Sequence, residues 1–205
     1  MLFLKHLNFL WPYLLCASFS VHSFEYKNRE HSFKETAYRQ GQVFVFHAVG
    51  YMLTQSDTIR EDGSWEGYKR RFLDFQYDPD NSVWNLLGHP LTGAQVFLFY
   101  RAYGYTREKS FLLGALSSLY FETLIESYTE RPSAQDTINT PIFGAMLGTG
   151  IERVSVELLN SNRKFYRAIG RIINPFSFLT NKNDFKAGII PLRGGASVLG
   201  GWRFD

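Results

Sequence analysis

The stretch WNLLGHPLTGAQ, residues 84–95, places an asparagine, a histidine and a glycine at four-residue spacing inside an otherwise apolar run. Because residues four apart lie on one face of an α-helix, Asn85, His89 and Gly93 would form a single stripe. Small residues in such a stripe let two helix backbones approach closely. The stretch therefore predicts a helix that packs through this stripe and carries a histidine to the contact.

Two later segments repeat this pattern of small residues that lead to polar ones. The stripes are Gly114, Ser118, Glu122 and Glu126 in one segment, and Gly144, Gly148 and Glu152 in the other. The simplest packing sets the three stripes against one another, and it would bring His89 and up to three glutamates together at the centre. Burying this much charge is costly unless the groups are paired, protonated or metal-bound. The pattern therefore predicts a helical core with a polar centre.

Capping signals place an earlier helix and a connector. Ser32 and Glu35 form a capping box before a helix that covers about residues 33–54. His47 lies on the apolar face of this helix and is interpreted as a core histidine. The following connector is broken by glycines and a proline, and it contains one short helix near residues 66–73.

Three longer helices are predicted for the core. The first covers about residues 83–103 and starts or kinks at Pro90, with Gly104 just past its end. The second is capped by Thr106 and runs to about residue 129. After a loop, the third begins with Thr140 as its cap and Pro141 as its first residue, and it ends near residue 160.

The C-terminal part contains a basic amphipathic segment. Arg163, Lys164, Arg167 and Arg171 accompany an apolar face in residues 163–173. This pattern is typical of a helix on a membrane surface, and a solvated face packed on the bundle explains it equally well. Pro175 ends the helical part, and the alternating pattern of residues 175–205 predicts a β-hairpin.

The fold class that follows is mainly α. We expect a bundle of four to five helices packed through small-residue faces, followed by a short C-terminal β-hairpin. The expected divisions are a signal peptide at 1–23, an N-terminal helix and connector at 24–82, a helical core at 83–174 and a hairpin tail at 175–205.

The first 23 residues have the layout of a secretory signal peptide. One lysine, Lys5, precedes an apolar stretch of about ten residues and small residues suited to cleavage after Ser23, and an uncleaved anchor helix is the alternative. Cys16 is the only cysteine and would be removed with this segment, which excludes disulfides and thiol catalysis in the mature chain. Removal of Lys5 leaves 21 basic and 19 acidic residues, a net charge of +2, which gives no argument for nucleic acid.

Two features favour a peripheral membrane protein. The 19 Phe, 12 Tyr and 4 Trp residues often flank apolar runs, as in proteins that work near a membrane interface. No predicted helix has the roughly 18 uncharged apolar residues that a membrane span requires. We therefore expect attachment to a membrane surface rather than insertion.

The polar centre allows a catalytic interpretation. His89 would act as a base or metal ligand, Glu122 and Glu126 as ligands or as an acid/base pair, and Asp136 as the residue that orients them. The spacing fits none of the established metal or nucleophile motifs, such as HExxH or GxSxG. No cofactor is predicted, and a divalent metal is the alternative left open.

The competing interpretation is a fixed polar network that holds the helices together. Arg101 would pair with Glu122 or Glu126, His89 would donate to a carboxylate, and Asn85 and Asp136 would cap helix ends. Arg101, Asn85 and Glu152 are the residues assigned to this network alone.

Four stretches carry a resemblance to a known family. Over about residues 84–152, the chain resembles the core of the bacterial "domain of unknown function 3943" family. The resemblance lies in the stretches WNLLGHPLTGA, YRAYGYTREKS, SSLYFETLIE and ERPSAQDTINTPIFGAMLGTGIE. The resemblance places His89, Glu122, Glu126, Asp136 and Glu152 on motif positions. It implies an exported protein of the bacterial cell envelope, and it assigns no reaction.

We therefore expect an exported cell-envelope protein in the periplasm or at a membrane, with a structural or interaction role at the membrane surface. Its partners would be that surface or another envelope protein, with no nucleic acid, and the sequence leaves the oligomeric state open. The alternative is a metal-assisted hydrolase that acts on an envelope lipid or glycan.

Overall fold

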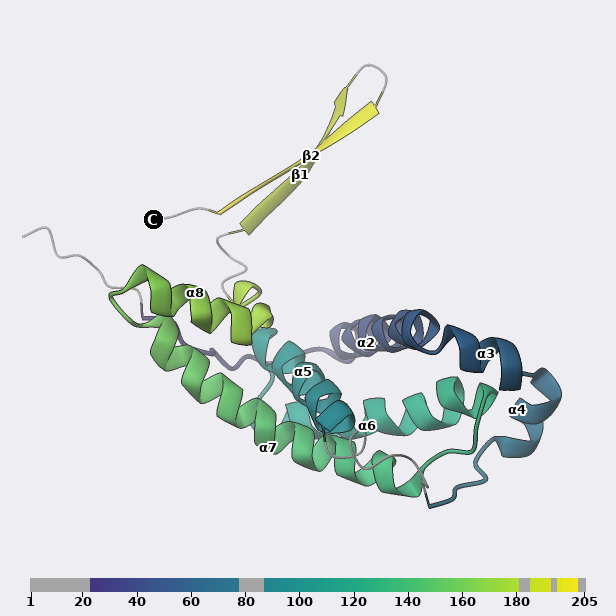
Figure 1. The fold of residues 1–205 in the computed structure, drawn as a ribbon. Coiled ribbons are helices and arrows are strands. Elements are labelled where there is room, and N and C mark those ends of the chain that lie inside the picture. The colour runs from purple at the N-terminus through teal and green to yellow at the C-terminus, as the bar shows by residue number, and fades with distance from the viewer. Residues whose placement is uncertain (1–22, 78–86, 181–184, 193–194, 203–205) are drawn as a thin grey trace, which may run out of the picture.

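Helices dominate the structure, which confirms the mainly α class (Figure 1). The computed structural model describes residues 23–77, 87–180, 185–192 and 195–202. The N-terminal half holds α2 (Phe33–Thr54), α3 (Ser56–Asp62) and α4 (Trp65–Arg71). The core holds α5 (His89–Ala102), α6 (Arg107–Tyr120) and α7 (Ala134–Leu159), and α8 (Lys164–Ile173) follows it. Residues 78–86, which include Asn85 and the predicted start of the first core helix, lie outside the described residues.

Short elements complete the chain. A π-helix, η3 (Phe121–Ile125), and a 3₁₀-helix, η4 (Glu126–Tyr128), continue α6, and a second 3₁₀-helix, η5 (Pro175–Phe178), follows α8. Strands β1 (Phe185–Leu192) and β2 (Gly195–Trp202) pair antiparallel, with Phe185 opposite Trp202. Within the described ranges, no helix combines the length and the apolar character needed to cross a bilayer.

The closest helix contact joins α5 to α7. A Cβ atom added at Gly93 would lie 2.2 Å from the backbone oxygen of Thr140, and one added at Gly144 would lie 2.5 Å from the backbone carbon of Gly93. One added at Gly148 would meet the Phe97 ring at 2.7 Å. Small residues are therefore required here, as the sequence predicted, because the two backbones touch.

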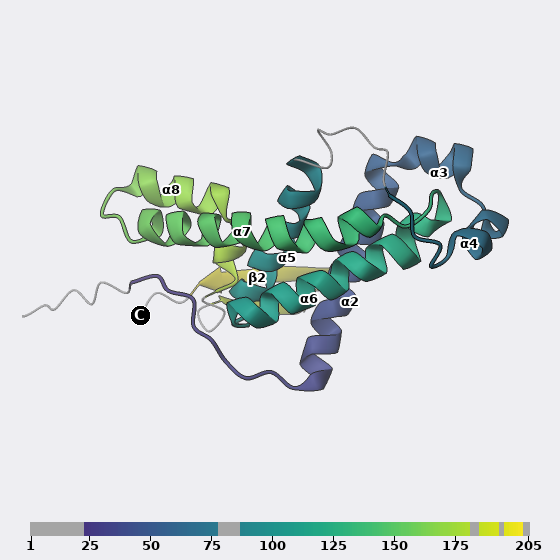
Figure 2. The same ribbon diagram turned by 90° about the horizontal axis from the view of Figure 1, so that it is seen from below.

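The contacts also fix the directions of the three core helices. Contacts between α5 and α7 advance from Gly93 with Gly144 to Phe97 with Gly148, so these two helices run in the same direction. Helix α6 runs the other way, since Arg107 at its start reaches Glu152, whereas Ser118 near its end donates to the backbone oxygen of Asp136. Figure 2 shows α6 alongside α7 from below, and α8 folded back along the far end of α7.

The start of α7 differs from the prediction. We expected Thr140 and Pro141 to begin this helix, but it begins at Ala134 and contains Pro141 in its interior. Ser133 is the cap, because its hydroxyl accepts a hydrogen bond of 3.0 Å from the backbone N–H of Asp136. The backbone of Gln76 also holds this turn, since it bonds Pro132 and Ala134 on either side of the cap. A distant segment thus supports a helix start that precedes the proline by seven residues.

Other boundaries agree well with the capping signals. Helix α2 covers the predicted range, and its cap is Ser32, whose hydroxyl accepts from the Glu35 N–H at 3.2 Å. Thr106 caps α6 through the N–H of Lys109. Helix α4 corresponds to the short helix predicted in the connector, whereas α3 was not predicted.

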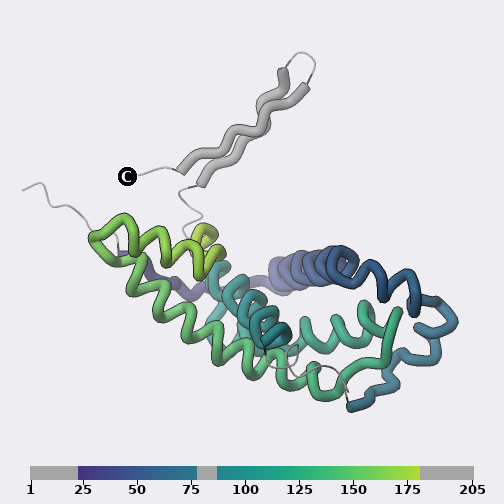
Figure 3. Tube along the Cα trace, in the orientation of Figure 1, coloured from purple at the N-terminus to yellow at the C-terminus, as the bar shows by residue number. Residues whose placement is uncertain are grey.

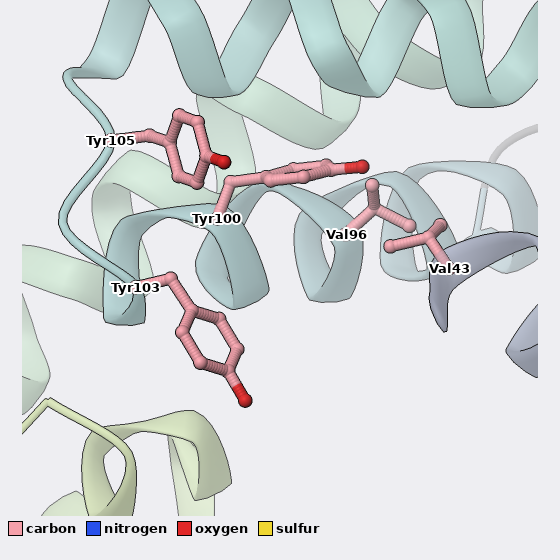
Figure 4. Packing of buried hydrophobic residues seen from close by; sticks show 5 residues of the cluster. All are labelled: Val43, Val96, Tyr100, Tyr103 and Tyr105. Carbon is pink, nitrogen blue, oxygen red and sulfur yellow. The ribbon is translucent and has the colours of Figure 1, made fainter. Parts of the chain in front are cut away.

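A cluster of aromatic side chains fills the space between α2 and α5. Figure 4 shows Val43 of α2 next to Val96 of α5, with Tyr100, Tyr103 and Tyr105 farther along. Tyr100 and Tyr105 are almost fully buried, and the Tyr105 ring stacks on His31 at a centroid distance of 3.6 Å. This cluster anchors α2 to the core.

The extended segment before α2 is also tied to the core. Figure 3 traces it from the end of α7, past α5, to the start of α2. The Phe24 N–H donates to Asn160 Oδ1 at 2.6 Å, and the Arg29 N–H donates to the Gly104 backbone oxygen at 2.9 Å. Gly104 has a φ of +89°, which a side chain would disfavour. The turn after α5 is therefore shaped to receive this segment.

We expect Gly93→Ala to lower the free energy of unfolding by about 1–3 kcal/mol, because the new methyl group would overlap the Thr140 backbone. Gly150→Ala is the matched control, since a Cβ there meets nothing within 4 Å. This control should stabilise α7 by about 1 kcal/mol through helix propensity. Urea unfolding of both variants measures the difference, and equal stabilities would contradict the close backbone contact.

Candidate functional site

The structure divides the predicted polar centre into two. His89 and Arg101 lie at opposite ends of α5, twelve residues or about 18 Å apart along the helix. Because α5 and α7 run in the same direction, Glu152 lies with Arg101 at one end of the core. Glu122 and Glu126 lie beyond the end of α6, at the other.

The first centre, the Arg101 cluster, is a buried and fully bonded ion pair. The Arg101 guanidinium donates from Nε to Glu152 Oε2 at 2.8 Å and from a terminal nitrogen to Oε1 at 3.1 Å. Its remaining nitrogen donates to Asn28 at 2.8 Å and to the Tyr105 backbone oxygen. Arg107 adds a 3.0 Å bond to Glu152 Oε1. The arrangement ties four segments of the chain together.

The predicted pairing of Arg101 with Glu122 or Glu126 is therefore wrong, since its carboxylate partner is Glu152. The physical reason is the parallel alignment of α5 and α7, which carries Glu152 toward Arg101 while α6 carries its glutamates away. Arg101 is 5% exposed and Glu152 is 3% exposed. A bidentate pair buried this deeply serves to fix the packing of the helices.

The second centre, the acid pair, consists of Glu122 and Glu126. Glu122 lies in the π-helix and is 1% exposed, and its Oε2 accepts a 2.8 Å bond from the Ser133 N–H. Burial raises the pKa of Glu122 to about 7, while hydrogen bonds from Glu126 and Ser133 oppose this shift. Burial, and then the charge of Glu122, raise the pKa of Glu126. Burial therefore favours a protonated state of the pair near neutral pH, and this proton belongs to the pair rather than to either residue.

His89 and Asp136 lie next to the acid pair. His89 Nε2 is 3.9 Å from Asp136 Oδ1, too long for a direct hydrogen bond. Asp136 is 2% exposed and belongs to the first turn of α7 rather than to a loop. The charge of Asp136 helps to raise the pKa of both glutamates of the pair. All four candidate catalytic residues are thus gathered at this end of the core.

A cavity of about 810 Å³ opens beside the acid pair. Its walls come from α2, α5, α6, η3 and α7, and they are mainly apolar. Lining residues include Phe97, Phe111 and Phe121 on the apolar side and Glu122, Glu126 and His89 on the polar side. Volumes of 300–1,000 Å³ are typical of sites for small organic ligands.

His47 is the residue that sequence reasoning undervalued. It is 8% exposed, as a core histidine should be, but neither ring nitrogen has a hydrogen-bond partner among the described residues. Its ring meets the edge of Phe121 at 5.3 Å and also lines the cavity. Burial lowers the pKa of His47 to about 4, so the ring is neutral. The apolar face of α2 predicted its burial, but no local pattern indicated that it would lack partners.

The geometry does not assemble a metal site in the described part of the chain. No group of three or more His, Cys, Asp or Glu side chains there is placed to hold an ion. The acid pair and His89 approach one cavity, but they do not converge on one point. The ligand set that the sequence suggested for a divalent metal is therefore not formed.

The basic residues of α8 separate into two groups. Arg163, Lys164 and Arg167 are exposed. Arg171 instead lies between the rings of Phe24 and Phe178, at 5.4 and 4.7 Å from their centroids. Burial lowers the pKa of Arg171, in keeping with its inward position.

We expect Arg101→Met to cost about 3–5 kcal/mol of unfolding free energy, because Glu152 would keep its buried charge without its main partner. The double variant Arg101→Met/Glu152→Met should recover much of this loss, since no uncompensated charge remains. Chemical denaturation of the two single variants and the double variant completes the cycle. A strictly additive double variant would contradict the coupling.

We expect the stability of the wild type to fall between pH 4.5 and about 7 through the acid pair. Unfolded glutamate releases its proton near pH 4.5, whereas Glu122 keeps its proton to about pH 7, so the folded state binds more protons in this window. Glu122→Gln/Glu126→Gln should remove this decline. His47 contributes the opposite slope below pH 6.5, but it does so in both proteins and cancels in the comparison.

Melting temperatures across this pH range provide the measurement. The control is Glu61→Gln/Glu66→Gln, which changes two exposed glutamates and should keep the slope of the wild type. Parallel curves for all three proteins would refute the assignment of a shared buried proton.

Comparison with known proteins gives one match. The family model described as Domain of unknown function (DUF3943) matches residues 74–176, which include α5, α6, α7, α8 and both polar centres. Searches of curated proteins and of solved structures find no match. The family match covers half of the chain and carries no reaction, and it agrees with the resemblance seen in the sequence. The chain belongs to this family of unknown function.

Proposed function

We propose that this protein is exported to the bacterial cell envelope and has a structural or interaction role at a membrane surface, to which α8 attaches it. The observation that carries the proposal is the exposure of apolar side chains on α8. Phe165 is 70% exposed and Ile172 is 77% exposed. Large apolar side chains are costly to leave in water, so an amphipathic helix that presents them is suited to a lipid interface.

The side of α8 that meets the core is different. A Cβ atom added at Gly170 would lie 3.0 Å from the Leu159 side chain and 3.2 Å from the Ser155 backbone oxygen, so this glycine is pressed against α7. Phe165 and Ile172 are therefore not needed for the packing of α8 on α7. They are free to contact something outside the described fold.

Exposed basic side chains lie on the other sides of the same helix. We define the attachment surface as Phe165, Ile172, Arg163, Lys164 and Arg167, all of them exposed. Each basic residue near an anionic bilayer contributes about 1 kcal/mol of attraction. Arg171 is left out, because it is directed toward Phe24 and Phe178. Apolar contact and charge together supply the two signals that stable attachment requires.

The signal-peptide pattern supports export. Phe24, the residue after the expected cleavage point, forms two hydrogen bonds with the Asn160 side chain. The Phe24 N–H donates to Asn160 Oδ1, and Asn160 Nδ2 donates to the Phe24 carbonyl oxygen. A chain that begins at Phe24 keeps this tie, since a terminal amine also donates hydrogen bonds. Cleavage after Ser23 is therefore compatible with the intact fold.

The hydrolase alternative receives no comparable support. Its metal would need ligands that the described residues do not bring together. His89 and Asp136 are 3.9 Å apart and the acid pair has its own hydrogen bonds, which is the geometry expected of a polar network at a cavity. We therefore keep membrane attachment as the proposed function.

The test uses the full chain expressed in a bacterium. We expect protein recovered from the envelope to have Phe24 as its first residue by intact mass. This protein should bind vesicles that contain anionic phosphatidylglycerol, and less well at high salt. Phe165→Ser/Ile172→Ser should weaken this binding about tenfold or more, because two apolar side chains no longer enter the interface.

The control replaces by serine two other large apolar residues that are more than half exposed, Leu112 of α6 and Ile138 of α7. This variant should bind vesicles as the wild type does. If the α8 variant and the control bind alike, α8 is not the attachment element. Recovery of the protein from the cytoplasm with residues 1–23 intact would reject export.

A further inference from the structure

The cavity beside the acid pair exists because small residues line α6 where it faces α5. A Cβ atom added at Gly114 would meet only the Val96 side chain, at 3.9 Å. Gly114 is thus unlike Gly93 and Gly144, where the backbones touch. Here the small residue leaves open space, and the space is part of the 810 Å³ cavity. The glycines of α5 and α7 therefore allow a close helix contact, whereas Gly114 of α6 leaves a gap between α6 and α5.

Several buried polar atoms of the cavity lining lack partners within the described part of the chain, among them those of His47 and Ser110. His47 is 8% exposed and neither of its ring nitrogens is hydrogen-bonded. Ser110 is fully buried and its hydroxyl is also without a partner. Buried polar atoms in folded proteins are almost always satisfied, so each exception calls for an explanation. A ligand whose polar head group lies beside His47 would supply the hydrogen bonds that this ring lacks.

The charges around the cavity decide which ligands fit. The cavity is lined by three glutamates, Glu122, Glu126 and Glu130. The basic side chains among the described lining residues are His89 and the neutral His47. A carboxylate or phosphate in this space would face the glutamates at short range. A group that donates hydrogen bonds or carries a positive charge would instead be attracted to them.

We propose that this cavity binds an amphiphilic amine, with its ammonium group at Glu122 and Glu126 and its alkyl chain along Phe97, Phe111 and Phe121. A neutral His47 offers one donor and one acceptor at the side of the cavity, and it can complete the hydrogen bonds of the head group. The apolar walls exclude water from the chain of the ligand. The proposal does not depend on the attachment of α8 to a membrane.

Binding has a consequence for the proton that the acid pair shares. An ammonium group next to Glu122 and Glu126 favours their charged forms, so the pair should release its proton when the amine binds. Proton release can be measured, because the apparent heat of binding then depends on the ionisation heat of the buffer. A fatty acid or an alcohol gives no such release at this site.

Three straight-chain probes with ten carbons each test the proposal: decylamine, decanol and decanoic acid. We expect titration calorimetry at pH 6.5, below the concentrations at which the probes aggregate, to find decylamine bound about tenfold or more tightly than decanoic acid. Decanol should lie between them. Glu122→Gln/Glu126→Gln should lower the affinity for decylamine by about tenfold while changing that for decanol by less than about twofold.

A filled cavity provides the structural control. Gly114→Leu places a side chain in the open space and should abolish binding of all three probes, whereas Gly150→Leu, which meets nothing within 4 Å, should leave binding unchanged. Ala145→Phe fills the same cavity from α7 and replaces Gly114→Leu if that variant does not fold. Phe165→Ser/Ile172→Ser should also bind decylamine normally, which separates this test from that of membrane attachment.

Several results would overturn the proposal. Decanoic acid binding as tightly as decylamine would show that the glutamates do not select the head group. Decylamine binding that survives both Gly114→Leu and Ala145→Phe would place the ligand elsewhere. Absence of binding by all three probes to the folded wild type would also reject the site.

Discussion

The backbone contact between α5 and α7 at Gly93 and Gly144 is the constraint on which the rest of the structure depends. It leaves no room for a side chain on either helix at the crossing, so it sets both the separation and the relative position of the two helices along their length. From that position, His89 comes to lie near Asp136, and Arg101 comes to lie against Glu152. One contact between small residues therefore determines which charged groups meet at each end of the core.

The two ends then use charge in opposite ways. At the Arg101 cluster, a guanidinium and a carboxylate are buried together with donors and acceptors matched, and the result is a rigid joint between α5, α7 and the N-terminal segment. At the acid pair, burial raises the pKa of both carboxyl groups, which favours their protonated forms. The first centre matches its charges within the chain, whereas the second borders the cavity in which we propose that an ammonium group replaces the proton.

Local features of the fold could be predicted from the sequence. The caps at Ser32 and Thr106 placed the starts of α2 and α6, because a cap depends on residues three apart in the chain. The glycine stripe of α5 and α7 also predicted their contact. The start of α7 could not be predicted, because the turn at Ser133 is held by Gln76, which is distant in sequence. Pro141 gave a plausible local signal that this long-range support overrode.

The sequence predicted the residues of the candidate site, but not that they would form two separate polar centres. His89, Glu122, Glu126 and Asp136 do gather at one end, since each lies on the inward face of its helix. Glu152 does not join them, because it lies sixteen residues, or about four turns, from Asp136 along α7, and helix direction is not encoded in a four-residue spacing. Whether His47 finds a hydrogen-bond partner depends on the side chains that other elements place around it, which no local sequence pattern can express.

The segment that ties Phe24 to Asn160 has a consequence for the order in which the chain can fold. Its partners, the turn at Gly104 and the end of α7, are separated from it by between about 75 and 136 residues. During synthesis, Arg29 can meet the turn at Gly104 first, whereas Phe24 has no partner at Asn160 until the end of α7 has emerged from the ribosome. Such long-range pairing forms late, because the ends of a long loop must meet before the contact is gained. Phe24 is thus made early but bound late, and the leading end of this segment stays open until α7 is complete.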